Sequence, residues 1–182
     1  MSPVNLPPPI KALIATPETP QLGPGPRAHV CPVAELNARL DAFLEGVELP
    51  LPNRQLIRAT VLLWHDHFDT AHGLAQEIES ADGSYVHGIL HRREPDYGNA
   101  KYWFHRVGTH PSFVELAAKG AGWLQDDREL ESKLIPRGLW DPFAYVDACE
   151  RVARRPASDG QTRRLRDLQA VELEILLARF CQ

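Results

Sequence analysis

A stretch of 26 residues without proline, from Arg54 to about Glu79, constrains the fold of this chain most strongly. Its apolar residues recur at alternating steps of four and three positions, which places them along one face of an α-helix. Asn53, immediately before the stretch, is a residue type that commonly caps a helix N-terminus. The pattern predicts one long amphipathic helix carrying Ile57, Val61, Trp64, Phe68, Ala71, Ala75 and Ile78 on its apolar face.

The rest of the chain after residue 31 carries similar helical signals. Proline or a capping residue precedes most apolar periodic segments, and glycine or proline follows several of them. Asp82 or Ser84 can cap a helix that runs to Glu94, and Asn99 can cap the next one. No segment alternates apolar and polar residues with the period of a β-strand. We therefore expect an all-α domain of about six or seven helices over residues 32–182.

The first 31 residues differ in composition from the remainder. Eight of the sixteen prolines in the chain lie there, and this density argues against a regular helix or a central strand. We expect an extended Pro-rich arm. It carries the apolar side chains of Ile10, Leu13 and Ile14, which leaves three arrangements open: a loose tail, an arm that covers its own domain, or an arm that covers a second subunit in a homodimer.

Composition excludes several classes of protein. The 182 residues carry 20 Lys and Arg against 24 Asp and Glu, so the net charge of −4 argues against a general nucleic-acid-binding protein. No apolar run is long enough for a membrane span, and no secretory signal is readable, so we expect a cytoplasmic protein. The three cysteines are far apart in sequence and predict neither a disulfide framework nor a Cys-rich zinc site.

Histidine is unusually concentrated in one part of the sequence. Seven of the eight histidines lie between His65 and His110. On the predicted long helix, a polar ladder follows one edge of the apolar face at steps of four, three and four. On the next predicted helix, a second ladder stands at positions i, i+4 and i+7. The first ladder is His65, Asp69, His72 and Gln76, and the second is His87, His91 and Glu94.

The short connection near residues 81–83 should fold these two helices into an antiparallel hairpin. Residues whose numbers sum to about 163 then lie at the same height. This register places His72 level with His91, Gln76 level with His87, and Asp69 level with Glu94. The two ladders are therefore predicted to face each other across a pocket.

Imidazoles four residues apart on a helix can bind one cation, and neutral imidazoles with carboxylates suit Zn, Fe, Ni or Mn. We predict a divalent-metal site with His72, His87 and His91 as the first choice of ligands and His65 as a further one. Asp69 and Glu94 are candidate proton carriers for hydrolysis or another reaction of metal and water. Two alternatives stay open, a metal-free binding or catalytic pocket and a polar network that only specifies packing.

The segment that follows is rich in cationic and aromatic residues. The functional interpretation is that several of them bind a small anionic substrate, arginine through its planar guanidinium. The alternative is a set of salt bridges to Glu94 and Asp96 on a solvated surface. Because the segment is itself partly acidic, RNA binding is disfavoured. The candidate substrate-binding residues are Arg92, Arg93, Lys101, Tyr102 and Arg106.

The strings WHDHFDTAHGLAQ and HRREPDYGNAKYW resemble a bacterial and fungal family of small uncharacterised proteins. The likeness runs from about Asn53 to the C-terminus and is most specific over the central fifty residues, so the arm lies outside it. The resemblance implies no named activity, and no residue role is transferred from it. HExxH and paired ExxH motifs are absent, which argues against zincin and ferritin-like di-iron proteins.

Overall fold

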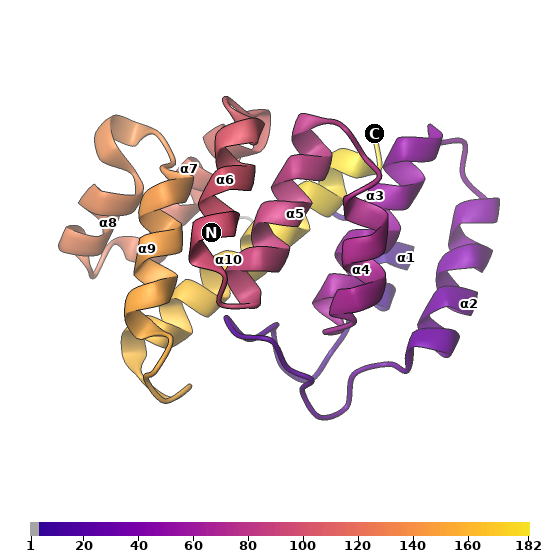
Figure 1. The fold of residues 1–182 in the computed structure, drawn as a ribbon, viewed down its shortest axis with the longest axis horizontal. Coiled ribbons are helices and arrows are strands. Elements are labelled where there is room, and N and C mark those ends of the chain that lie inside the picture. The colour runs from indigo at the N-terminus through magenta and orange to yellow at the C-terminus, as the bar shows by residue number, and fades with distance from the viewer. Residues whose placement is uncertain (1–3) are drawn as a thin grey trace.

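The computed structural model describes residues 4–182, and this part of the chain forms ten α-helices and one short 3-10 helix without a β-strand (Figure 1). The predicted all-α fold is confirmed. The N-terminal half comprises α1 (Pro8–Leu13), α2 (Val33–Glu45), α3 (Leu51–Trp64), α4 (Phe68–Ala75) and α5 (Ala81–Arg93). The C-terminal half comprises α6 (Tyr97–Val107), α7 (Pro111–Leu124), α8 (Arg128–Leu134), η1 (Pro136–Gly138), α9 (Pro142–Val152) and α10 (Gly160–Phe180).

The predicted long helix over residues 54–79 is wrong, because the chain breaks between Trp64 and Phe68 into α3 and α4. Asp66 lies in the left-handed region with φ 64°, which reverses the chain direction, and α4 packs against α3 instead of continuing it. The Asp66 carboxylate accepts hydrogen bonds from the Arg27 backbone N–H and Nε at 2.9 Å and from Arg93 Nη2 at 2.6 Å. Two arginines distant in sequence therefore hold the break in place.

The Pro-rich arm contains a helix, contrary to the prediction. α1 begins at Pro8, where proline is tolerated because the first helical turn needs no N–H donors within the helix. Ile10, Leu13 and Ile14 are at most 6% exposed within their own chain. Of the three arrangements that the sequence left open, the arm covers its own domain. Together with the break in the long helix and the short α8, α1 explains why there are more helices than predicted.

The C-terminal helix α10 forms much of the core. Figure 1 shows it running diagonally behind α5 and α6, and it packs against α3, α7 and α9. Its buried face is mostly apolar but includes Gln169 and Glu172, which are almost completely buried. The helix thus combines a hydrophobic face with two polar side chains that need partners inside the protein.

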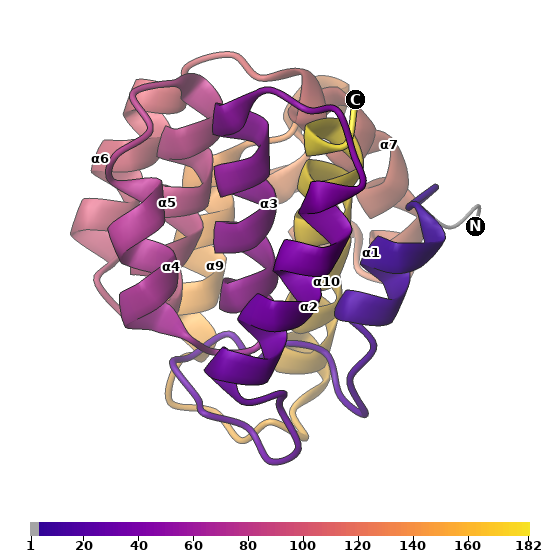
Figure 2. The ribbon, with the colours of Figure 1, turned by 90° about the vertical axis from the view of Figure 1, so that its right-hand side faces the viewer.

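Helix α5 is an interior helix, packed against α3, α4 and α6 (Figure 2). Every residue from Gly83 to Arg93 is buried. Ser80 caps it, since its side chain accepts a hydrogen bond from Gly83 N, and Asp96 caps α6 through Asn99 N. These caps lie a few residues before the predicted ones, Asp82 or Ser84 for α5 and Asn99 for α6.

Candidate metal centre

Three histidines from two helices meet between α4 and α5. His72 of α4, His87 and His91 each offer one ring nitrogen, and these three atoms lie within 4.8 Å of one another. His87 and His91 are buried and one turn apart on α5, whereas His72 is half-buried. The arrangement converges three imidazoles on one point, which is the geometry that a metal ion requires.

The ring of His87 is fixed on two sides. Its Nε2 lies 2.6 Å from His72 Nε2, so one of the two imidazoles donates a hydrogen bond to the other. Its face stacks on Trp103 of α6, with 3.9 Å between ring centroids and an interplanar angle of 15°. His87 Nδ1 is buried and has no hydrogen-bond partner in the described structure. A buried polar atom without a partner is costly, and an ion bound through His87 Nε2 would not relieve that cost.

His91 is oriented by acidic residues that follow it. Its Nδ1 lies 3.3 Å from Glu94 Oε2 and 3.9 Å from Asp96 Oδ2, which favours a proton on Nδ1. The lone pair is then on Nε2, as in the carboxylate–histidine–metal arrangement of many metalloproteins. Asn99 Nδ2 lies 3.2 Å from this Nε2 and is the group that a bound ion would displace.

The two buried histidines are neutral near pH 7. Burial, together with smaller effects of the neighbouring His72 and His91, lowers the pKa of His87 to about 4. Burial also lowers the pKa of His91, although Glu94 opposes this shift. Because a metal ion binds the neutral imidazole, His87 and His91 need lose no proton before they bind one.

The donor set fits a divalent ion after a small adjustment. Zinc–nitrogen bonds of about 2.0–2.1 Å in a tetrahedral site separate two ligand nitrogens by about 3.3 Å. The His72–His87 nitrogen pair, at 2.6 Å, would therefore open by about 0.7 Å on binding an ion, and a nitrogen pair at the 4.8 Å limit of the cluster would close by about 1.5 Å. His72 is half-buried on the short helix α4, so a side-chain rotation there can supply this movement.

The other members of the predicted first ladder lie elsewhere. His65 binds the arm: its Nε2 is 2.8 Å from Leu13 O, and its Nδ1 accepts a hydrogen bond from Cys31 N. Asp69 and Gln76 are exposed on α4. The break at Asp66 separates His65 from the helix that carries His72, so the ladder does not stay on one face.

Arg92 and Arg93, expected at the substrate site, are fully buried. Arg92 pairs with Glu172 at 2.5 Å and with Gln169 at 3.3 Å, both on α10. Arg93 binds Asp66, Leu63 O at 2.6 Å and Gln21 O at 3.0 Å. In this structure both guanidinium groups join parts of the protein and are not presented to a ligand.

The remaining candidates lie on α6. Lys101 pairs with Asp147 of α9 at 2.5 Å. Tyr102 is exposed and packs edge-on against Trp103, while the Arg106 guanidinium lies 5.3 Å from the centroid of the Trp103 ring. Tyr102 and Arg106 thus lie around the same tryptophan that supports His87.

Sequence reasoning did not place Trp103 or Asn99 in the histidine cluster. Both lie on α6, four residues apart, and that spacing puts them on one face of the helix. This spacing was a signal in the sequence, but Asn99 was interpreted only as a helix cap.

No protein-family model, no curated protein and no solved structure matches this chain. The resemblance to a bacterial and fungal family therefore stays a prediction. Within residues 4–182, none of the helices combines the length and the apolar character needed to cross a membrane.

Proposed function

We propose that this protein binds one divalent metal ion through His72, His87 and His91. The observation that carries the proposal is the convergence of three imidazole nitrogens within 4.8 Å between α4 and α5. The neutral state of His87 and the contact between Glu94 and His91 support it. Imidazole ligands of this kind suit Zn, Fe or Ni, and the carboxylate nearby also admits Mn.

We further propose an enzymatic role for the site, with hydrolysis of a small anionic molecule as the reaction class. An ion held by three protein ligands keeps a position for water or substrate and makes bound water more acidic. Glu94 holds the His91 Nδ1 proton and so directs the other nitrogen toward the ion. Arg106 is exposed, and its guanidinium lies 5.3 Å from the centroid of the Trp103 ring that stacks on His87, so it is available to an incoming anion.

Metal binding is tested on full-length protein purified without a histidine tag and stripped with a chelator. We expect about one Co²⁺ or Zn²⁺ per chain by elemental analysis after dialysis, and visible absorption bands of Co²⁺ bound to nitrogen ligands. His87→Ala and His91→Ala should abolish both signals. The matched control is His105→Ala, because His105 is exposed on α6 and packs near Phe143.

A protein that binds no metal would favour the alternative, a polar network that only specifies packing. His72 and His87 already satisfy each other through one hydrogen bond, so a structural role needs no ion. Protein that binds no Co²⁺ at micromolar concentrations would refute the metal site. Metal-loaded protein that fails to hydrolyse chromogenic phosphate and carboxylate esters would refute the hydrolytic role for those substrates while metal binding stands.

A further inference from the structure

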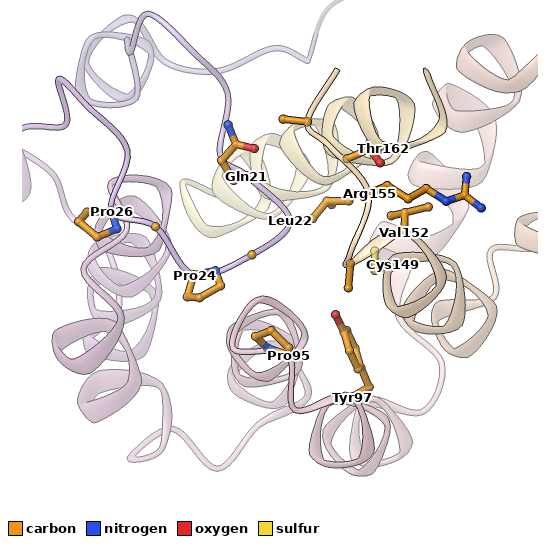
Figure 3. A pocket seen from close by; sticks show the side chains of 14 residues that line it. Gln21, Leu22, Pro24, Pro26, Pro95, Tyr97, Cys149, Val152, Arg155 and Thr162 are labelled. Carbon is orange, nitrogen blue, oxygen red and sulfur yellow. The ribbon is translucent and has the colours of Figure 1, made fainter. Parts of the chain in front are cut away.

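A cavity of about 410 Å³ lies apart from the histidines, between the arm, the start of α6 and the end of α9 (Figure 3). The arm contributes residues 21–26 to its wall, and the opposite wall includes Val152. Pro95 and Tyr97 line it, whereas Glu94 and Asp96 of the same loop approach His91. Volumes of about 300–1,000 Å³ are typical of small-molecule sites, so the cavity is large enough for a ligand.

The lining carries almost no charge toward the cavity. Leu22, Pro24 and Val152 present apolar groups. Burial raises the pKa of Cys149 to about 12, so its thiol is neutral. The single cationic side chain, Arg155, donates a hydrogen bond to Gln161 and lies near Asp159, and in Figure 3 its guanidinium is turned away from Tyr97. A charged ligand would therefore find no unengaged ionic partner in this lining.

The Tyr97 hydroxyl is a polar group of the lining that is available to a ligand. Figure 3 shows the Tyr97 side chain reaching from α6 with its hydroxyl directed toward Leu22 and Cys149. This hydroxyl makes no hydrogen bond with another group in residues 4–182. Burial raises its pKa, so the hydroxyl stays protonated near pH 7 and can donate.

The arm wall of the cavity is held in place before any ligand arrives. Gln21 O accepts hydrogen bonds from Arg93 Nε at 3.0 Å and from Gln169 Nε2 at 2.9 Å, and both donors are buried. Arg27, just after the wall, binds Asp66. A preformed wall lowers the entropic cost of binding a small molecule.

We infer that this cavity binds a small, uncharged and mainly apolar molecule that accepts one hydrogen bond from the Tyr97 hydroxyl. The size of the cavity, its mainly apolar lining and the Tyr97 hydroxyl directed into it carry the inference together. It does not depend on the metal site, and it is tested on the chelator-stripped protein.

The probe is acetophenone, which joins an aromatic ring to one carbonyl acceptor, titrated into the ¹⁵N-labelled full-length protein by NMR. We expect saturable shifts confined to amides of residues 21–27, 96–98 and 149–162. Benzoate and benzylammonium, of similar size but charged, should bind at least about tenfold more weakly. The absence of saturable shifts with acetophenone, or tighter binding of benzoate, would overturn the inference.

Variants locate the binding. Ala153 is exposed at the edge of the cavity, so Ala153→Trp should block it and abolish the shifts without disturbing the core. The control is Ala118→Trp, an exposed alanine on α7 outside the cavity, which should bind as the wild type does. Tyr97→Phe should weaken binding about fivefold to tenfold, as expected for one lost hydrogen bond. Unchanged affinity in Tyr97→Phe, or in Ala153→Trp with a native circular dichroism spectrum, would also overturn the inference.

Discussion

Replacing Asp66 by asparagine should destabilise the protein by about 3 kcal/mol, because it breaks a buried ion pair. The Asp66 side chain is fully buried, as is that of Arg93, and its carboxylate accepts three hydrogen bonds from the two arginines. Asparagine has nearly the same shape and tolerates a positive φ, so the change removes charge and one acceptor while sparing the backbone.

The size of this loss of stability depends on which hydrogen-bond partners Arg93 retains in the Asp66→Asn variant. Burial lowers the pKa of Arg93 to about 10, so its guanidinium is still charged at pH 7 and would lose the one carboxylate that it pairs with in residues 4–182. It retains the carbonyl oxygens of Leu63 and Gln21. Removing one partner of a buried pair costs about 3–5 kcal/mol, and the retained acceptors favour the lower end. For a chain of this size, about 3 kcal/mol corresponds to a fall in Tm of roughly 6–12 °C.

The assay is urea unfolding followed by circular dichroism at 222 nm, with chelator present so that no bound metal shifts the equilibrium. The control is Glu129→Gln, which breaks an exposed pair with Lys133 and should change the free energy of unfolding little. A loss below about 1 kcal/mol for Asp66→Asn would refute the argument that this pair holds the break between α3 and α4.

The pH dependence gives a second check. Burial alone would raise the pKa of Asp66, but Arg93 and Arg27 outweigh it and hold the pKa below 3.8. A folded-state pKa below the unfolded one means that ionised Asp66 stabilises the fold above about pH 4, and that this stabilisation is lost as pH falls through the folded pKa. The difference between the wild type and Asp66→Asn should therefore be constant from pH 7 to 5 and shrink below pH 4. A difference that stays constant down to pH 2.5 would contradict the assignment.

Two further predictions address the metal centre and the packing of α5. Glu94→Gln should weaken Co²⁺ binding by about tenfold or more, because the carboxylate beside His91 Nδ1 is lost; isothermal titration measures this, and affinity equal to that of Glu129→Gln would leave Glu94 without a role in the site. Gly83→Ala should destabilise the protein by about 1–3 kcal/mol, since a Cβ there would lie 2.1 Å from Ile78 O. Gly73 is exposed on α4, and a Cβ there meets nothing within 4 Å, so Gly73→Ala should raise the free energy of unfolding by about 0.5–1 kcal/mol. Urea unfolding decides this pair of variants, and changes of the same sign would contradict the packing argument.

The sequence predicted the helical class and one part of the candidate site well. His87 and His91 are four residues apart on one helix, and helix geometry alone brings such side chains to one face. Their convergence with His72 was predicted from the hairpin register. In the structure His72 Nε2 meets His87, at a height where Gln76 was expected, because loop geometry shifts the register by a few residues.

The fate of the arginines could not be predicted from the local sequence. Arg92 and Arg93 stand next to each other after His91, in a segment whose composition suggests a solvated or substrate-binding surface. Their partners, Glu172 and Asp66, lie 80 and 27 residues away along the chain. A buried cation is stable only beside partners of opposite charge, and no local sequence pattern predicts which distant residues these are.

What the sequence determined by itself is therefore the set of distances within each helix, because a rise of about 1.5 Å per residue fixes them once a segment is helical. Helical periodicity and the His87–His91 pair belong to that set. Only the tertiary structure decided where the long apolar pattern breaks, since the periodicity runs on through Asp66 while Arg27 and Arg93 hold that residue in a reversed backbone conformation. That break folds α4 against α3 and brings His72 to α5, so the third imidazole of the site depends on ion pairs formed far away in sequence.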